Sequence, residues 1–493
     1  MSFPPSDYGL REAVRSQALA AALPAYIRER RWFGGKSREI TACSIADALP
    51  LPANAPLAYL CVVEISYADG GSDSYLLPLA SADGVQAAEL RRTTPQAVVM
   101  TTDDLSGDGA LYDAVYDPAF CQLLLGIVER GERAGGAIGT LLAEPTAAFA
   151  GLRGVGELEP RISLAEQSNT SIIYGDRLIL KLFRRLVPGL NPDLEIGRFL
   201  TEQGQFIQIA PVAGSLSYAS GDNETATLGV LMGYVPNVGD AWSRMLELLR
   251  EVPEHASPAD LTIIAARTLG QRTAEMHMAL ANSQEPSFAP EPFSMPHAEA
   301  EMAAMNALAD RVFVEARAHH GNQPASVQHT VAEVLAREPQ IRARFARLTA
   351  QPLTGQRTRA HGDYHLGQVL ATPDADFIVI DFEGEPARSL DERRAKRSPL
   401  RDVAGMLRSF DYVAATGLPD EAAPGWVATV SQAFLDSYLK TASDASFLPH
   451  DEAERAALLD AYLIEKAVYE LQYELNNRLD WVRIPAGGIL RLL

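Results

Sequence analysis

The sequence predicts an α+β protein with two lobes, a β-rich N-terminal lobe followed by a mostly helical C-terminal lobe. The chain has 493 residues, which is too long for one ordinary hydrophobic core. Apolar runs separated by turn residues dominate up to about residue 237. Later segments are rich in Ala, with apolar residues three and four apart. Strands first and helices afterwards are typical of α+β proteins.

The N-terminal lobe is expected to contain a helix, a hairpin and a second β-rich part. Residues 1–24 predict a helix that ends at Pro24, because apolar residues recur on one face. Two apolar runs around Asp69-Gly70-Gly71 predict a hairpin. The remaining expectations are a helical then Gly/Ala-rich segment over 110–147, three strands over 156–186, a capped helix over 191–203 and a strand that stops at Pro236.

The C-terminal lobe is expected to contain long helices. The pattern predicts helices over 258–282, 296–318 and 328–349, and further helices from about 399 to the end. Between them lies a stretch of short apolar runs with acidic residues, and no repeat period is visible.

Composition excludes several classes of protein. The net charge of −20 disfavours nucleic acid as a partner, because phosphate backbones need basic surfaces. Every long apolar run is broken by charge or Pro, so no membrane span is predicted. No signal peptide is visible, and three scattered cysteines form neither a disulfide framework nor a thiolate metal site. A reducing cytoplasm fits this chain.

Two short stretches carry the candidate chemistry. "RTRAHGDYHLGQVL" contains Asp363 and, five residues later, Gln368, and "FIVIDFEGEP" places Asp381 at the end of an apolar run. Phosphoryl transfer needs an orienting group for the acceptor hydroxyl, cations at the phosphates and a held metal. Asp363 is predicted to be the catalytic carboxylate. Gln368 and Asp381 have the places of the metal ligands in the protein-kinase pattern.

Upstream residues complete that pattern in order. Lys181 lies within "LILKLF", where a phosphate-pairing lysine belongs, and Glu195 on the next helix is expected to hold it. The turn "EQSNTS" precedes Lys181 and can cover phosphates with backbone N–H groups and hydroxyls. Five elements in this order favour phosphoryl transfer, although each one alone is more often structural.

Three other motifs are given structural interpretations. "GLRGVG" lacks the Gly-Lys-Ser/Thr ending of a phosphate loop and predicts a turn. His361 and His365 are four apart, but Gly362 stands where the zinc motif has Glu. His361 is therefore expected to support the loop through hydrogen bonds. "TAEMHMAL" has the spacing of core packing.

The chain resembles the bacterial maltokinase family, which is related to the aminoglycoside phosphotransferases. The resemblance rests on "RWFGGKSR", "EQSNTSIIYGDRLILKLFRRL", "NPDLEIGRFL", "HGDYHLGQVL", "DFEGEPARSLDERRAKRSPLRDVAGMLRSFDY" and "EKAVYELQYELNNR", and covers about residues 26–486. It implies a two-lobed protein-kinase-like fold with an extra N-terminal cap. The expected parts are the cap over 1–110, a β-rich kinase N-lobe over 111–237 and a helical C-lobe over 238–493.

The resemblance also implies an activity and its cofactors. Members of the family use ATP and Mg²⁺ to phosphorylate maltose at its anomeric hydroxyl, giving maltose 1-phosphate for α-glucan synthesis. Trehalose synthase is the implied partner enzyme. Residue by residue, the resemblance gives Asp363 as the catalytic residue and Gln368 and Asp381 as Mg²⁺ ligands. The residues expected at ATP are Ser168, Asn169, Thr170, Ser171, Lys181, Glu195 and, in the hinge, Gly233, Tyr234 and Val235.

A disaccharide needs aromatic faces and polar groups for its hydroxyls. Lys466, Tyr469, Glu470 and Tyr473 have helical spacing and share one face of the last long helix. The alternative is a core tyrosine pair beside an ordinary helix ion pair. The residues expected at maltose are His361, Arg408, Tyr412, Lys466, Glu470 and Tyr473.

Two other functions stay open at this point. One is a kinase-like phosphotransferase for another sugar or an aminosugar, which an acidic acceptor pocket would favour. The other is a non-catalytic nucleotide-sensing or scaffold protein that assembles with a trehalose synthase. The presence of Lys181, Asp363, Gln368 and Asp381 counts against the second.

Overall fold

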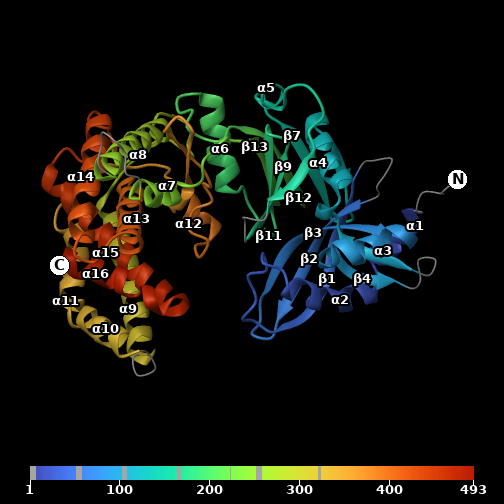
Figure 1. The fold of residues 1–493 in the computed structure, drawn as a ribbon, viewed down its shortest axis with the longest axis horizontal. Helices are drawn as coiled ribbons and strands as arrows, with labels where there is room; N and C mark the ends of the chain where they lie inside the picture. The colour runs from blue at the N-terminus through green and yellow to red at the C-terminus, as the bar shows by residue number, and fades with distance from the viewer. Residues whose placement is uncertain are drawn as a thin grey trace. The chain divides into compact units, whose positions relative to one another are not determined.

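The computed structural model describes residues 7–51, 58–102, 108–163, 168–221, 224–250, 258–319 and 324–493. It divides into two compact units. Unit 1 comprises Met1–Thr201 and Ala210–Val235, and unit 2 comprises Glu202–Ile209 and Pro236–Leu493. The β-sheets lie in unit 1 and long helices fill unit 2 (Figure 1). This confirms the predicted α+β class.

Unit 1 contains two antiparallel sheets. The first has the order β1-β2-β3-β5-β4, with β11 paired to β3, and the second has the order β6-β7-β12-β13-β10-β9-β8. The first comprises β1 (Ile40–Pro50), β2 (Ala58–Tyr67), β3 (Ser72–Ala82), β4 (Val98–Thr102), β5 (Gly109–Asp113) and β11 (Arg185–Leu186). The second comprises β6 (Arg133–Gly135), β7 (Gly139–Pro145), β8 (Pro160–Ser163), β9 (Asn169–Tyr174), β10 (Leu178–Phe183), β12 (Val212–Ser220) and β13 (Glu224–Gly233).

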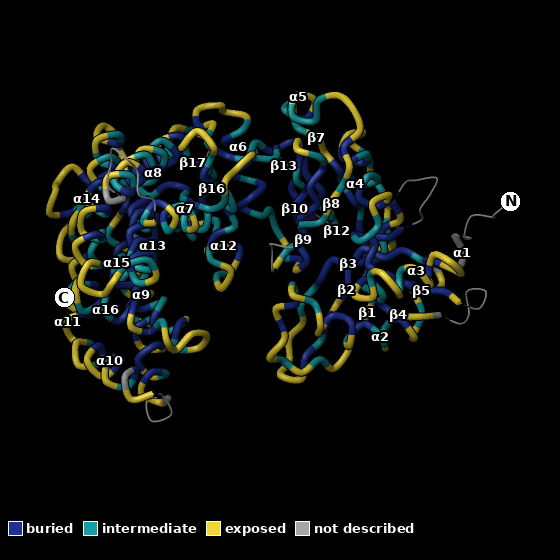
Figure 2. The backbone as a smooth tube through the Cα atoms, in the orientation of Figure 1, coloured by how far each residue is buried: buried dark blue, intermediate teal, exposed yellow. Residues whose placement is uncertain are grey.

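The first sheet is buried on both faces. Because side chains alternate along a strand, Cys61 and Val63 of β2 face one hydrophobic core and Leu60 and Val62 face another. The first core includes helices α1 (Asp7–Val14) and α2 (Gln17–Arg28), and the second includes α4 (Pro118–Arg130) and the second sheet. Figure 2 shows the resulting burial along β2 and β3. The other helices of this part are α3 (Gly84–Thr93), α5 (Phe149–Arg153) and α6 (Pro192–Gln203).

Asp47 joins the two sheets of unit 1. Its carboxylate accepts hydrogen bonds from the backbone N–H groups of Ala137 and Gly139, both at 2.8 Å, and from Tyr218 Oη at 2.9 Å. Asp47 lies on β1, and its partners lie at β7 and β12 of the other sheet. Burial opposes ionisation, but these hydrogen bonds outweigh it and lower the pKa of Asp47.

A buried ion pair forms a second connection. Arg184 Nη2 lies 2.9 Å from Asp113 Oδ2, and both side chains are almost fully buried. Arg184 also donates to Thr170 Oγ1, and its guanidinium lies over the ring of Trp32. Arg184 follows β10 directly, so this pair fixes the end of the strand that carries Lys181.

Unit 2 is built around a helix pair, α13 (Leu400–Gly417) and α15 (Glu452–Asn477), which pack on one another. Two short antiparallel strand pairs interrupt the helices: β14 (Glu291–Pro292) pairs with β15 (Gln356–Arg357), and β16 (Val369–Ala371) pairs with β17 (Phe377–Val379). The other helices are α7 (Ala241–Leu248), α8 (Pro258–Ala281), α9 (Met295–His319), α10 (Ala325–Ala336), α11 (Glu338–Phe345), α12 (Leu390–Arg394), α14 (Ala423–Thr441) and α16 (Arg483–Leu492). Within the described ranges, none of the helices combines the length and apolarity needed to cross a bilayer.

The structure confirms the hairpin over 57–80, whose strands are β2 and β3, and the helix over 191–203. The prediction that the first helix ends at Pro24 is wrong. Pro24 lies inside α2, which continues to Arg28 because Leu23, Tyr26 and Ile27 are buried on both sides of it.

Two further expectations are also wrong. The region 110–147 is not mainly helical: β5 and β7 flank α4, since this segment completes both sheets of unit 1. The helix expected over 328–349 is divided at Arg337, where Pro339 in the first turn of α11 starts a new helix.

Asp47→Ala should lower the free energy of unfolding by about 3 kcal/mol or more, because several buried N–H groups lose their acceptor. Urea unfolding at neutral pH measures this. The control is Asp176→Ala, whose side chain is 90% exposed and should tolerate the change.

The lowered pKa of Asp47 also predicts the pH dependence. Its stabilisation is fully present above the unfolded-state pKa of about 3.9 and is lost as the pH falls through the lower folded-state pKa. When the pH falls below about 4, the free energy of unfolding should therefore decrease less in Asp47→Asn than in the wild type. Identical acid profiles for the two proteins would contradict the role of this carboxylate.

Candidate active site

The loop that carries Asp363 has a backbone conformation that only glycine adopts easily. Gly362 has φ +87°, and a Cβ there would lie 3.3 Å from Gly384 Cα. Glycine at position 362 therefore permits the turn and also lets the segment after Asp381 approach the loop closely. Asp363 follows with a half-buried side chain.

Asp402 on α13 holds this loop from beneath. Its carboxylate accepts from the N–H of His361 at 2.7 Å and from the N–H of Gly362 at 3.0 Å. Helix α13 comes close enough because residue 405 is glycine, where a Cβ would lie only 2.5 Å from Tyr364 O. Burial opposes the charge of Asp402, but the hydrogen bonds outweigh it and lower the pKa of the carboxyl.

His277 and His361 extend this network. His277 is fully buried on α8, and its Nε2 lies 3.1 Å from Asp402 Oδ2. His361 is also buried, and its Nε2 lies 2.9 Å from Ile380 O. A carbonyl only accepts, so this nitrogen of His361 carries the proton. His361 thus connects the Asp363 loop to the residue before Asp381, as the sequence predicts, and it does not line the cavity described below.

The two predicted metal ligands lie on neighbouring turns. The N–H of Ile380 donates to Gln368 O at 3.1 Å. Gln368 is therefore hydrogen-bonded to the residue that precedes Asp381. Asp381 has φ +66°, a left-handed conformation that is uncommon for residues other than glycine. Such strain is typical of sites where the surrounding structure fixes a side chain. A carboxylate and an amide oxygen are a suitable donor set for Mg²⁺.

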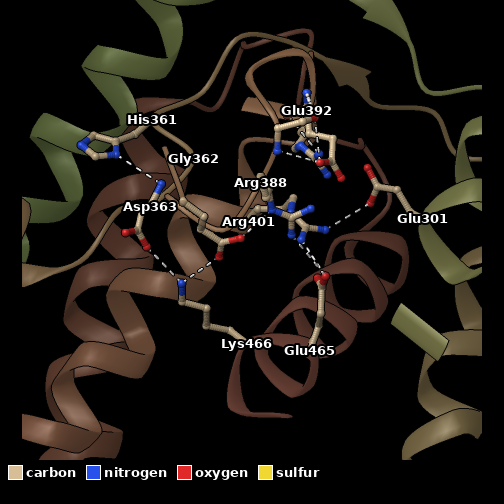
Figure 3. Close-up of polar contacts among 12 residues, drawn as sticks. Glu301, His361, Gly362, Asp363, Arg388, Glu392, Arg401, Glu465 and Lys466 are labelled. Carbon is tan, nitrogen blue, oxygen red and sulfur yellow. Dashed lines mark hydrogen bonds and ion pairs between the residues drawn. The ribbon is translucent and has the colours of Figure 1, made fainter. Parts of the chain in front are cut away.

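Lys466 on α15 forms ion pairs with two carboxylates at Asp363. Its Nζ donates to Asp363 Oδ1 at 3.2 Å and to Glu385 Oε1 at 3.0 Å (Figure 3). Burial disfavours the ammonium ion, but the two carboxylates outweigh burial and raise the pKa of Lys466. Burial raises the pKa of Glu385, but Lys466, Arg388 and Arg401 outweigh burial and lower it to about 2. No hydrogen bond from a described residue reaches Asp363 Oδ2.

Asp363 opens into a cavity of about 410 Å³ within unit 2. This volume lies within the range of about 300–1,000 Å³ that is usual for small-molecule sites. Helices α9, α13 and α15 and the segment 384–397 form its walls. Its charged lining residues are Arg311, Asp363, Glu385, Arg388, Glu392, Arg393, Arg397, Arg401, Asp402, Glu465 and Lys466, and Tyr462 and Tyr469 are its aromatic side chains besides Tyr364.

The predicted sugar residues divide into two groups. Lys466 lines the cavity, but Arg408, Tyr412, Glu470 and Tyr473 do not. Arg408 is fully buried and donates to Glu470 Oε2 at 2.7 Å and to Asp411, so its charge is already neutralised. Tyr412 donates to Glu474, and Tyr473 is 48% exposed elsewhere on α15. The helical face shared by these residues therefore does not extend the cavity as the sequence predicted.

Lys181 forms an ion pair with Asp193. Lys181 Nζ donates to Asp193 Oδ2 at 3.0 Å, and both side chains are buried. The sequence assigns this role to Glu195, two positions later on α6. Asp193 lies in the first turn of α6, and the role of Glu195 stays a prediction. Asn191 Oδ1, which accepts from the N–H of Asp193 at 2.9 Å, fixes that turn.

The residues predicted for the phosphate turn and the hinge are in unit 1. Only Ser168 precedes β9, since Asn169, Thr170 and Ser171 are already strand residues. The Thr170 hydroxyl accepts from Arg184. In the hinge, the N–H of Gly233 donates to Pro211 O and the N–H of Tyr234 donates to Arg177 O.

Four residues of this site were not singled out in the sequence: Asp193, His277, Glu385 and Asp402. Asp402 had one visible signal, an acid within the apolar helix pattern "LRDVAGML". Glu385 and Asp193 lie close to predicted residues, but their spacing gave no means of choosing them. Some of their partners are far away in the chain: 125 positions separate His277 from Asp402, and 81 separate Glu385 from Lys466.

Two family models match the chain. The "Maltokinase N-terminal cap domain" matches residues 26–117, and the "Phosphotransferase enzyme family" matches residues 158–436. The glucosamine kinase of Streptacidiphilus jiangxiensis is 28% identical over 342 residues, which is 67% of this chain and 72% of that protein. The glucosamine kinase of Mycolicibacterium smegmatis is 25% identical over 333 residues, or 66% and 78% of the two chains.

Solved structures share the fold. A glucosamine kinase in complex with glucosamine, ADP and inorganic phosphate has a TM-score of 0.67 at 22% identity and covers 100% of both chains. A second crystal form of glucosamine kinase has a TM-score of 0.68 at 23% identity, covering 97% of this chain and 99% of that one. With the domain matches, this confirms the expected kinase-like fold with an extra N-terminal cap. Since the second family model spans more than half of the chain, the protein belongs to the phosphotransferase enzyme family and carries a maltokinase-type cap domain.

Proposed function

We propose that this phosphotransferase transfers the γ-phosphate of ATP to the anomeric hydroxyl of maltose and forms maltose 1-phosphate. The observation that carries the proposal is the cavity beside Asp363, which has the size of a small-molecule site and a lining without an excess of carboxylates. The maltokinase-type cap domain and the resemblance of the site motifs to maltokinases support the choice of sugar. The relatives named as glucosamine kinases support a sugar as acceptor.

Asp363 would orient the acceptor hydroxyl. Lys466 occupies Oδ1 of its carboxylate, which leaves Oδ2 to accept a hydrogen bond from the sugar. The hydroxyl oxygen attacks the γ-phosphorus while the bond to the ADP oxygen breaks, and its proton passes to Asp363. Asp402 keeps the loop in position through the N–H groups of His361 and Gly362.

Lys181, held by Asp193, would bind the phosphates of ATP as a point charge. Ser168 and the first residues of β9 would cover these phosphates. The hinge around Val235 would contact the adenine. Asp381 and Gln368 would hold Mg²⁺, which neutralises charge on the phosphates when bound. The division into a cap over 1–110, an N-lobe over 111–237 and a C-lobe over 238–493 is part of this proposal.

The charge of the cavity favours a neutral acceptor over an amine. Six cationic side chains and five anionic ones line it, so it has no excess of carboxylates to attract an ammonium group. The lining includes Asp363 and, on α9, Ala304 and Arg311. Phosphorylation of glucosamine is the second candidate, because both curated relatives are named for that activity. A separate trehalose synthase as the source of maltose, and a cytoplasmic location, complete the proposal.

A sugar panel tests the acceptor. With ATP and Mg²⁺, maltose should give the highest kcat/KM among maltose, glucose, glucosamine and trehalose, and NMR of the product should show phosphate on the anomeric carbon. A higher kcat/KM for glucosamine would replace maltose by the second candidate. No turnover of any sugar would overturn both.

Asp363→Asn should lower kcat by about 10²–10⁴-fold, because the amide cannot take the proton. The Kd for ATP should stay unchanged, since the residue faces the acceptor cavity. Asp374→Asn, on an exposed turn of the neighbouring hairpin, is the control and should keep full activity. A variant Asp363→Asn that keeps more than about a tenth of the wild-type kcat would contradict the assignment.

Two tyrosines on α15 form a matched pair. Tyr469 lines the cavity, and Tyr473, one turn later, does not. Tyr469→Ala should raise the KM for maltose by about tenfold through lost stacking on a sugar ring, with the KM for ATP unchanged. Tyr473→Ala should leave both constants unchanged. The melting temperatures show whether each variant is folded, and the reverse pattern would move the acceptor site to the outer face of α15.

A further inference from the structure

Two arginines of the cavity have no carboxylate partner. The other cations there are paired: Lys466 with Asp363 and Glu385, Arg388 with Glu385, and Arg401 with Glu465 and Glu301. Figure 3 shows Arg401 between Glu301 and Glu465. Among the described residues, no carboxylate lies within ion-pair distance of Arg311 or Arg397. The cavity therefore has unbalanced positive charge at these two side chains.

Arg397 is held in place but not neutralised. Its backbone pairs with Thr358, and its Nη2 donates to the carbonyl oxygen of Glu392 at 3.1 Å. The side chain is half-buried beside Arg401 and Arg388. Burial and these two cations lower the pKa of Arg397 by more than the carboxylates of Glu301 and Glu465 raise it. The guanidinium therefore lies in surroundings of net positive charge, which a bound anion would offset.

Arg311 lines the cavity from another segment, helix α9. Ala304, Ala307, Leu308 and Arg311 line it with helical spacing, so one face of α9 contributes all four. The alanines leave space in front of the helix, and the exposed Arg311 side chain has the freedom to contact a ligand. The two unpaired guanidinium groups thus belong to separate walls of one cavity.

We propose that Arg311 and Arg397 form an anion subsite that binds the phosphate group of a sugar phosphate. A phosphate monoester carries a charge of about −1.5 to −2 and three acceptor oxygens. As a ligand for two guanidinium groups it is therefore better suited than a carboxylate, which has one charge and two oxygens. The consequence is product inhibition that is competitive with the acceptor, because both occupy the same cavity. The identity of the sugar rests on the proposed function, but binding of the phosphate group does not.

Calorimetric titration of the full chain without nucleotide tests the subsite. The probes are inorganic phosphate and α-glucose 1-phosphate. Both should bind the wild type, and Arg397→Gln and Arg311→Gln should each weaken binding by at least about tenfold. Arg397→Lys should weaken it less, because the charge stays while the planar fork is lost. The exposed Arg92→Gln is the control and should bind like the wild type.

Three outcomes would overturn the proposal. One is no binding of either probe to the wild type. Another is binding that is lost in Lys181→Met but kept in Arg397→Gln, which would place the phosphate at the nucleotide residues. The third is glucuronate binding as tightly as glucose 1-phosphate, which would remove the preference for phosphate. Failure of maltose as a substrate would overturn the proposed function and leave these titrations unaffected, and melting temperatures check that each variant is folded.

Discussion

The carboxylate of Asp402 holds the loop on which the candidate chemistry depends. Asp402 lies at the start of α13 and is buried beneath the loop. Its carboxylate accepts hydrogen bonds from two consecutive backbone N–H groups, and its Oδ2 lies beside Nε2 of His277. A loop with a left-handed glycine has no regular hydrogen bonds of its own, so these contacts replace them. Gly405 permits the approach, and the position of Asp363 follows from both residues. The loop geometry is thus set from outside the loop.

Charge pairing explains the form of the cavity. A buried ammonium at Lys466 is tolerable because Asp363 and Glu385 surround it, and the same ion pairs keep both acids ordered. Arg401 on α13 and Glu465, the residue before Lys466 on α15, form a second ion pair of this kind. In the part of the chain that the structure describes, such pairing leaves one oxygen of Asp363 without a hydrogen bond and two arginines of the cavity without a carboxylate partner. A lining with a slight excess of cationic side chains favours neutral or anionic ligands over amines.

Unit 1 uses buried polar contacts where two sheets meet. Asp47 connects β1 to β7, and Arg184 pairs with Asp113 at the end of β10. Lys181 lies three residues before Arg184, so the cap side of the unit and the candidate nucleotide lysine share one strand. Removing either contact would leave buried N–H groups or a buried charge without a partner. The loss of folding free energy would be larger than for the loss of an exposed ion pair. The cap is therefore an integral part of this unit.

The sequence by itself determined the fold class, the β2–β3 hairpin and the turns that carry Asp363, Gln368 and Asp381, because these depend on periodicity and spacing within about 25 residues. Tertiary structure decided the rest. It paired Lys181 with Asp193, placed Arg408 and Glu470 in a buried ion pair, and continued α2 through Pro24. Helical spacing says which residues share a face, but only packing decides what that face contacts. Contacts such as Asp363 with Lys466 join residues 103 positions apart, and no local pattern encodes them.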